Sequence, residues 1–166
     1  MKSACSVLFV CMGNICRSPT AEAVLKSQLQ AAGLTDRVTV DSAGTHDYHI
    51  GQAPDPRAVL AAQLRGFDLS SLRGRQVTRV DLTRFDYVLA MDQDNLAQVK
   101  KLSRQPGEKV RAELRLVLDF LPGHEGQSVP DPYFGGDVGF THVLDLLEEA
   151  CQGFIQMNVI GQTPRQ

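Results

Sequence analysis

The sequence predicts an α/β fold, a three-layer sandwich in which helices cover both faces of a parallel sheet. Short apolar segments of strand length alternate along the chain with longer segments whose apolar residues recur at a helical period. Such an alternation favours crossover connections, which place helices on both sides of parallel strands. The chain has 166 residues, 43% of them hydrophobic and 22% charged, which suits one globular domain with its own core. We therefore expect a single domain over residues 1–166.

The first two elements are a strand and a helix separated by a glycine-containing turn. Residues 6–10 form a continuous apolar run, typical of a strand buried on both faces. In the helix that follows, Ser18 is the expected N-cap, Pro19 suits the first turn and Gly33 closes the end. The apolar positions of this helix are Ala21, Val24, Leu25, Leu29 and Ala32.

The later elements repeat this order. Residues 38–40 read as a second strand, and Asp55 with Pro56 opens a helix that carries Leu60 and Leu64 and stops at Gly66. The remaining predicted elements are a strand over 86–90, a helix capped by Asp92, a fourth strand over 114–118 whose period also fits a helical turn, and an amphipathic helix from Phe140.

Composition excludes several classes of function. The net charge is −2, which gives no electrostatic reason to expect nucleic acid as a partner. The longest apolar run spans residues 7–12, far short of the ~20 residues that a membrane span needs. Four unevenly spaced cysteines do not suggest a secreted disulfide framework, so we expect a cytoplasmic protein.

The turn after the first strand reads Cys11-Met-Gly-Asn-Ile-Cys-Arg17-Ser18. A loop of this length that enters a helix can direct successive N–H groups at one point, and the helix dipole adds to the positive field there. Gly13 and Asn14 are residue types that tolerate left-handed backbone. Arg17 can close this anion cradle with a planar fork of donors. The segment therefore predicts a phosphate-binding loop.

Cys11 lies at the base of this predicted loop, where the field favours a nucleophilic thiolate. Ser18 can donate its hydroxyl to the same sulfur. Cys16 is either a packed residue at the helix start or a thiol that forms a reversible disulfide with oxidised Cys11. A zinc site is not expected, because two cysteines without a second Cys or His pair do not supply four ligands.

A second catalytic group is expected in the long segment 122–136, which is rich in proline and glycine. Asp131 lies there between two prolines and is the candidate general acid for expelling an alkoxide or phenoxide. Its alternative is an exposed turn aspartate. Tyr133 and Phe134 follow as an expected aromatic wall. The four histidines, His46, His49, His124 and His142, lack ligand spacing and are expected on the surface.

With these motifs, the chain closely resembles the low-molecular-weight protein-tyrosine phosphatases. The matching segments are residues 10–23, 41–45, 55–57, 75–76, 85–87 and 91–92, with Asn95, and 131–133. The resemblance implies a four-stranded parallel sheet and hydrolysis of phosphotyrosine through a cysteinyl-phosphate, with no metal and no cofactor. It implies that Cys11 is the nucleophile, Arg17 the phosphate clamp and Asp131 the general acid.

The resemblance also implies supporting roles. Ser18 would contact the thiolate, Asn14 and Ser42 would brace the loop, and Tyr48, Tyr133 and Phe134 would line the substrate cleft. The implied phosphate-binding loop consists of Met12, Gly13, Asn14, Ile15, Cys16 and Arg17. Many relatives have a histidine where this chain has Leu72, so we expect the brace of Asn14 to depend on Ser42 alone.

The resemblance implies phosphotyrosine-containing proteins as partners, a bacterial tyrosine kinase among them, and a monomer or weak dimer. Two other functions stay open. An arsenate reductase of the same fold would need a further cysteine in the middle of the chain, and none lies between Cys16 and Cys151. A non-catalytic phosphate-binding regulator would usually lack the nucleophile or the acid, and both Cys11 and Asp131 are present.

Overall fold

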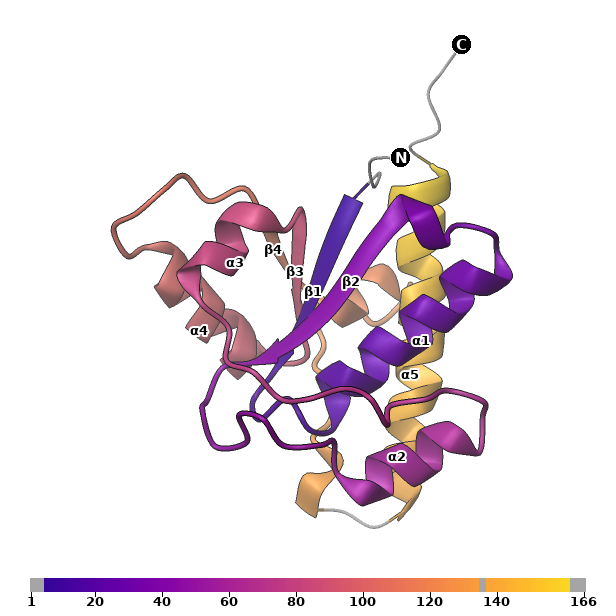
Figure 1. Cartoon of the computed structure of the whole chain (residues 1–166). Coiled ribbons are helices and arrows are strands. Elements are labelled where there is room, and N and C mark those ends of the chain that lie inside the picture. Colours follow the sequence, from indigo (N-terminus) through magenta and orange to yellow (C-terminus); the bar gives the residue numbers. More distant parts are fainter. Residues whose placement is uncertain (1–4, 135–136, 162–166) are drawn as a thin grey trace.

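Four parallel strands in the order β2-β1-β3-β4 form the central sheet of the computed structural model (Figure 1). The structure describes residues 5–134 and 137–161, although for residues 134, 137 and 138 it describes only the backbone. The strands are β1 Cys5–Cys11, β2 Val38–Gly44, β3 Tyr87–Ala90 and β4 Glu113–Leu116. The predicted α/β class, with a four-stranded parallel sheet, is confirmed.

Helices cover both faces of this sheet, as the sequence predicts (Figure 1). On one face lie α1 Arg17–Ala31, α2 Pro56–Gln63 and α5 Asp137–Ile155, and on the other lie α3 Arg79–Arg84 and α4 Gln93–Ser103. The side chains of β1 alternate between the two layers, because successive residues of a strand point to opposite faces. Val7 and Phe9 pack with α1 and α5, whereas Leu8 and Val10 pack with α4.

The predicted strands and long helices are confirmed, with differences at their ends and one omission. Strand β4 ends at Leu116 and the chain continues into a 3₁₀ turn, Val117–Phe120, so the predicted strand over 114–118 is too long. Helix α3 was not predicted. It has only six residues, but Thr78 and Asp81 form a capping box at its start, and that spacing is a sequence signal for a helix.

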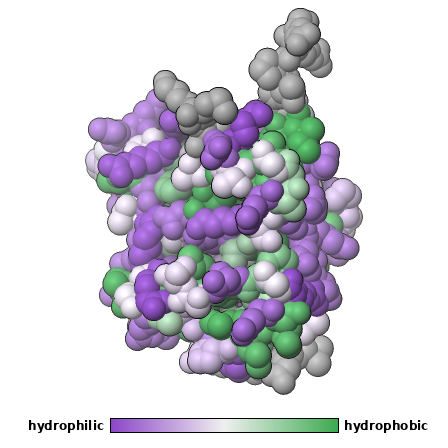
Figure 2. Space-filling model, turned by 45° about the vertical axis from the view of Figure 1, so that its right-hand side comes forward, coloured by the Kyte–Doolittle hydropathy of each residue, from purple (hydrophilic) through white to green (hydrophobic). Residues whose placement is uncertain are grey.

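Helix α2 begins as predicted, with Asp55 as its N-cap and Gly66, at φ +86°, beyond its end. Its buried face is made of Ala58 and Ala62, whereas Leu60 and Leu64 are 58% and 80% exposed. Small residues face the core here, where α2 is in contact with α5. On the face of the molecule shown in Figure 2, hydrophobic residues gather towards the upper and lower ends among hydrophilic ones.

None of the helices in residues 5–134 and 137–161 combines the length and the apolar character that crossing a bilayer requires.

Candidate active site

The loop between β1 and α1 lies against the end of β2. The backbone N–H groups of Thr45 and His46 donate to the carbonyls of Cys11 and Met12 at 2.9 and 3.0 Å. Gly44 is needed for this approach, because a Cβ atom at that position would lie 2.8 Å from the Met12 carbonyl oxygen. The two strand ends therefore hold the loop at the carboxyl edge of the sheet, where ligands of such folds bind.

Asn14 fixes the shape of the loop. It adopts left-handed backbone at φ +58°. Its Nδ2 donates to Ser18 Oγ at 2.8 Å and Ser42 Oγ at 3.1 Å, and its Oδ1 accepts the Arg75 N–H at 3.1 Å. The expectation that Ser42 alone braces Asn14 is therefore wrong. Leu72 packs against the core.

Gly13 does not use left-handed backbone, which corrects the sequence-based expectation. Its lack of a side chain matters for a different reason. A Cβ at Gly13 would lie 2.9 Å from the His49 ring, so the glycine admits that ring against the loop.

The brace continues to a buried carboxylate that the sequence reading missed. Ser42 Oγ donates to Glu22 Oε1 at 2.7 Å, and Lys26 pairs with the other oxygen of Glu22 at 2.5 Å. Glu22 is only 4% exposed, and a buried carboxylate needs such partners. The sequence did contain a signal for this pair, because Glu22 lies four residues before Lys26 on an expected helix and such residues face each other.

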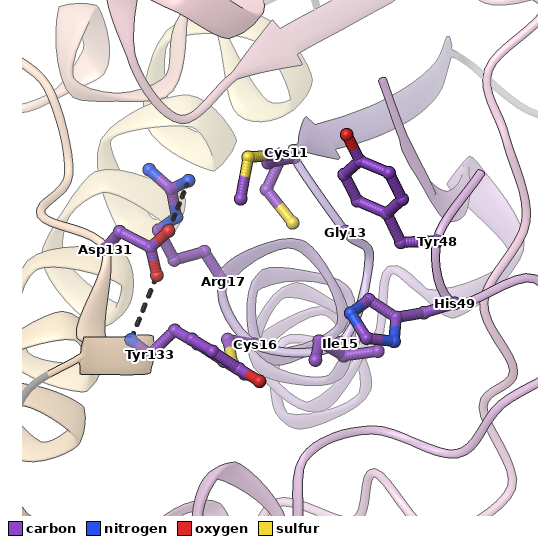
Figure 3. Close-up of a pocket in the computed structure, with 10 residues that line it drawn as sticks. Cys11, Gly13, Ile15, Cys16, Arg17, Tyr48, His49, Asp131 and Tyr133 are labelled. Atoms are coloured by element: carbon purple, nitrogen blue, oxygen red, sulfur yellow. Dashed lines mark hydrogen bonds and ion pairs between the residues drawn. The ribbon is translucent and has the colours of Figure 1, made fainter. Parts of the chain in front are cut away.

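Cys11 is buried, and its Sγ faces the pocket (Figure 3). The Asn14 N–H donates to this sulfur at 3.3 Å, and Ser18 Oγ lies 2.9 Å from it. Because Asn14 Nδ2 already donates to Ser18 Oγ, the hydroxyl hydrogen is free to point at the sulfur, which is nearer than the other acceptor within reach, the Ala43 carbonyl at 3.4 Å. The expectation that Ser18 is the N-cap of α1 is therefore wrong. Cys16 occupies the cap position, and Ser18 lies inside the helix.

Arg17 is almost fully buried and is held in place by protein groups. Its Nη1 donates to Asp92 Oδ2 at 2.7 Å and to the Val129 carbonyl at 3.0 Å, while its Nη2 lies 3.7 Å from Asp131 Oδ2. Asp92 also caps α4 by accepting the Asn95 N–H, as predicted. Its ion pair with Arg17 was not predicted from sequence.

These groups meet in a pocket of about 200 Å³. In Figure 3, Asp131 and Tyr133 lie on one side of the pocket and Tyr48 and His49 on the other. Asp131 Oδ1 accepts the Tyr133 N–H at 3.0 Å. The lining residues are Cys11, Met12, Gly13, Ile15, Cys16, Arg17, Tyr48, His49, Asp131 and Tyr133.

The rim of the pocket differs from expectation at His49. This ring lines the pocket and pairs through Nδ1 with Gln52 Oε1 at 2.8 Å, so His49 lies at the pocket rim, which the sequence did not indicate. Tyr48 is 64% exposed and stacks on His46. The side chain of Phe134, predicted to line the cleft, lies outside the described part of the structure.

Cys16 lines the same pocket as Cys11, and both cysteines are buried. Burial raises the pKa of the Cys16 thiol, and nearby Asp55 adds to the effect, so Cys16 stays neutral at physiological pH. Within residues 5–134 and 137–161, no three His, Cys, Asp or Glu side chains are grouped as metal ligands.

Fold and pocket together define an α/β protein with a cysteine and an arginine at the two ends of the loop between β1 and α1, and an aspartate that lines the same pocket. The profile of the family described as "Low molecular weight phosphotyrosine protein phosphatase" matches residues 6–162. A Streptomyces coelicolor low molecular weight protein-tyrosine-phosphatase is 42% identical over 153 residues, covering 90% of each chain. The chain belongs to the low molecular weight phosphotyrosine protein phosphatase family.

Solved structures agree with this assignment. A protein tyrosine phosphatase from Entamoeba histolytica, crystallised with Hepes in its active site, superimposes with a TM-score of 0.85 at 41% identity, covering 96% of this chain and 99% of that one. A Drosophila arginine phosphatase superimposes with a TM-score of 0.87 at 31% identity, covering 99% and 100%. The fold therefore occurs in enzymes named for two different phosphorylated side chains.

Proposed function

We propose that this protein hydrolyses phosphotyrosine in proteins, and other aryl phosphate monoesters, through a cysteinyl-phosphate intermediate. The observation that carries the proposal is the shared pocket in which Cys11 Sγ, Arg17 and Asp131 meet. We also propose that residues 1–166 act as one domain for this reaction.

In the first step, the phosphate dianion enters the loop and pairs with Arg17 and the loop N–H groups. Cys11 attacks phosphorus as a thiolate, so an S–P bond forms while the ester P–O bond breaks. Asp131 gives its proton to the departing phenolate, which leaves as tyrosine. The loop donors stabilise the negative charge on the transferring group.

In the second step, water attacks the phosphocysteine and Asp131, now a carboxylate, takes a proton from that water. The S–P bond breaks, inorganic phosphate is released and Cys11 regains its thiolate. The Asn14 N–H and the Ser18 hydroxyl, both in hydrogen-bond contact with this sulfur, stabilise the charge on it as it leaves.

The pocket walls favour an aryl group over a phosphoguanidine. Ile15, Tyr48 and Tyr133 present apolar and aromatic surface around the cradle, which suits the ring of phosphotyrosine. A phosphoarginine would bring a guanidinium with several N–H donors against this largely apolar surface, where its desolvation is costly. We therefore propose phosphotyrosine rather than phosphoarginine as the substrate.

The experiment compares purified wild type with two variants on a phosphotyrosine peptide, a phosphoarginine peptide and a nitrophenyl phosphate, with and without EDTA. Cys11→Ser should abolish turnover and still bind phosphate. Asp131→Asn should lose about 10² to 10⁴ in rate on phosphotyrosine. Asp47→Asn, which removes an exposed carboxylate from the segment that carries Tyr48, serves as the matched control and should stay active.

Activity in Cys11→Ser, or full inhibition by EDTA, would refute the mechanism. Faster hydrolysis of the phosphoarginine peptide would refute the substrate. Turnover of arsenate with a thiol reductant, or tight phosphate binding without any turnover, would support one of the two other functions that the sequence left open.

In the cell, we propose a cytoplasmic enzyme that acts on tyrosine-phosphorylated proteins, including a bacterial tyrosine kinase, as a monomer or weak dimer. The family assignment and the absence of a basic charge excess support this proposal. Phosphotyrosine proteomics with the trapping variant Cys11→Ser, together with sedimentation of the pure protein, tests it.

A further inference from the structure

Arg57, at the start of α2, connects two loops of the pocket that are distant in sequence. On one side it is tied to the phosphate-binding loop through Asp55, whose backbone N–H donates to the Ile15 carbonyl at 2.8 Å. The Asp55 carboxylate accepts from the Arg57 backbone N–H at 2.8 Å, from Nε at 3.1 Å and from Nη2 at 2.9 Å. The guanidinium thus has a fixed orientation relative to that loop.

On its other side, Arg57 holds the segment that carries Asp131. Nη2 donates to the Tyr133 carbonyl at 3.0 Å. The guanidinium carbon also lies 5.5 Å from the centre of the Tyr133 ring and 5.0 Å from that of Phe140. Phe140 is buried in α5, so the cation is placed between a fixed aromatic ring and a loop residue.

Tyr133, in turn, orients the acid. Its backbone N–H donates to Asp131 Oδ1 at 3.0 Å, and Figure 3 shows this bond at the edge of the pocket. Arg17 Nη2 also faces this carboxylate, but at the longer distance of 3.7 Å from Oδ2. The direction of the Asp131 carboxyl group therefore depends on where the Tyr133 backbone lies.

We propose that Arg57 is a positioning residue for Asp131: it clamps the Tyr133 backbone against the phosphate-binding loop, so that the acid faces the leaving oxygen. This inference rests on the proposed phosphatase function. A catalytic group displaced by about 1 Å loses on the order of 10² in rate. Because Arg57 holds Tyr133, two residues after Asp131, it affects proton donation without touching substrate.

Charge steering is the alternative role for a cation at a phosphate pocket. Arg57 is poorly suited to it because Asp55 already neutralises its charge. The Arg57 side-chain hydrogen bonds lower the pKa of Asp55, which keeps that carboxylate ionised at neutral pH. A lysine would preserve the ion pair, but it lacks the planar fork that reaches Asp55 and the Tyr133 carbonyl together.

The test measures kcat/KM, which reports the step that expels the leaving group, for aryl phosphates with phenols from strongly acidic dinitrophenol to tyrosine. The variants are Arg57→Met and Arg57→Lys, each also combined with Asp131→Asn. Arg65→Met is the matched control. Arg65 forms ion pairs with Asp145 and Glu148 of α5, and it does not line the pocket.

We expect Arg57→Met to lose about 10- to 100-fold on phosphotyrosine but little on the dinitrophenyl ester, which needs no acid. Arg57→Lys should fall between wild type and Arg57→Met, and it also serves if Arg57→Met folds poorly. In the Asp131→Asn background, Arg57→Met should add almost nothing, because the acid it positions is gone. Arg65→Met should keep the wild-type dependence on leaving group.

Equal losses on all esters, or a raised KM for all of them, would overturn the positioning role in favour of general damage or charge steering. Full activity of Arg57→Met on phosphotyrosine would overturn it as well. Failure of the proposed function would look different: wild type itself would not hydrolyse aryl phosphates, or Cys11→Ser would, and the role of Arg57 would fall with it.

Discussion

Asp92 has two structural tasks, which Asp92→Asn and Asp92→Ala separate. The carboxylate pairs with buried Arg17 at 2.7 Å and caps α4 through the Asn95 N–H. Asparagine is as good an N-cap as aspartate, so Asp92→Asn removes the charge and leaves the cap. Asp92→Ala removes both.

The cost of Asp92→Asn follows from the surroundings of the pair. A hydrogen bond to a charged group contributes about 1.5 to 3 kcal/mol. The Asp92 side chain is 23% exposed, and Val129 still accepts from Arg17, so we expect the lower end, about 1.5 to 2 kcal/mol. At about 2 to 4 °C per kcal/mol for a chain of this size, Tm should fall by about 3 to 8 °C. Asp92→Ala should cost about 1 kcal/mol more, from the lost cap.

Thermal unfolding with and without saturating phosphate measures both effects. In phosphate, the bound dianion supplies the negative charge that Arg17 loses when Asp92 is replaced, so the Tm deficit of Asp92→Asn should shrink to less than half. Asp145→Asn is the control, since its ion pair with Arg65 is exposed and worth about 0.2 to 1 kcal/mol, without phosphate dependence. A deficit for Asp92→Asn that is absent, or unchanged in phosphate, refutes the reasoning.

Three further predictions concern other contacts of the site. Leu72→His should lower Tm without changing phosphate affinity, because Leu72 packs on the core and Asn14 already has other partners; a higher affinity in isothermal titration contradicts this. After peroxide inactivation and thiol reduction, wild type should regain activity while Cys16→Ser does not, because Cys16 lines the same pocket as Cys11 and its thiol would trap the sulfenic acid; equal recovery excludes Cys16 as the resolving thiol. Hydrogen bonds from the Arg57 side chain lower the pKa of Asp55 from its usual value, so this pair stabilises the folded state above the usual pKa of an aspartate, and the stabilisation is lost as the pH falls through the folded-state pKa. In urea unfolding, Arg57→Met should therefore be less stable than wild type at neutral pH, and the difference should vanish in acid. A difference that stays constant with pH contradicts the linkage.

The sheet could be predicted from sequence because its strands are buried on both faces. Residues 7–10 are apolar without interruption, and the structure places their side chains alternately in two cores. Helix α2 shows the limit of this signal. Leucines usually mark the buried face of a helix, but α2 buries Ala58 and Ala62 and turns Leu60 outwards. The buried face of α2 is decided by its packing against another helix, and the periodicity of a single sequence does not report that contact.

The site divides in the same way. Cys11, Asn14 and Arg17 lie in one short loop, so local spacing alone could suggest that they converge on an anion. Residues that reach the loop from elsewhere in the chain could not be assigned to the site from sequence. The pattern around Asp92 predicted only a helix cap, and His49 was expected on the surface. Asp92 is a cap, and its second oxygen binds Arg17. A capping aspartate has two oxygens and the cap uses one of them, so an N-cap at the carboxyl edge of a parallel sheet has an acceptor directed at the ligand site. That geometric rule makes such caps candidates for holding catalytic arginines wherever a strand, a cap and a helix follow one another.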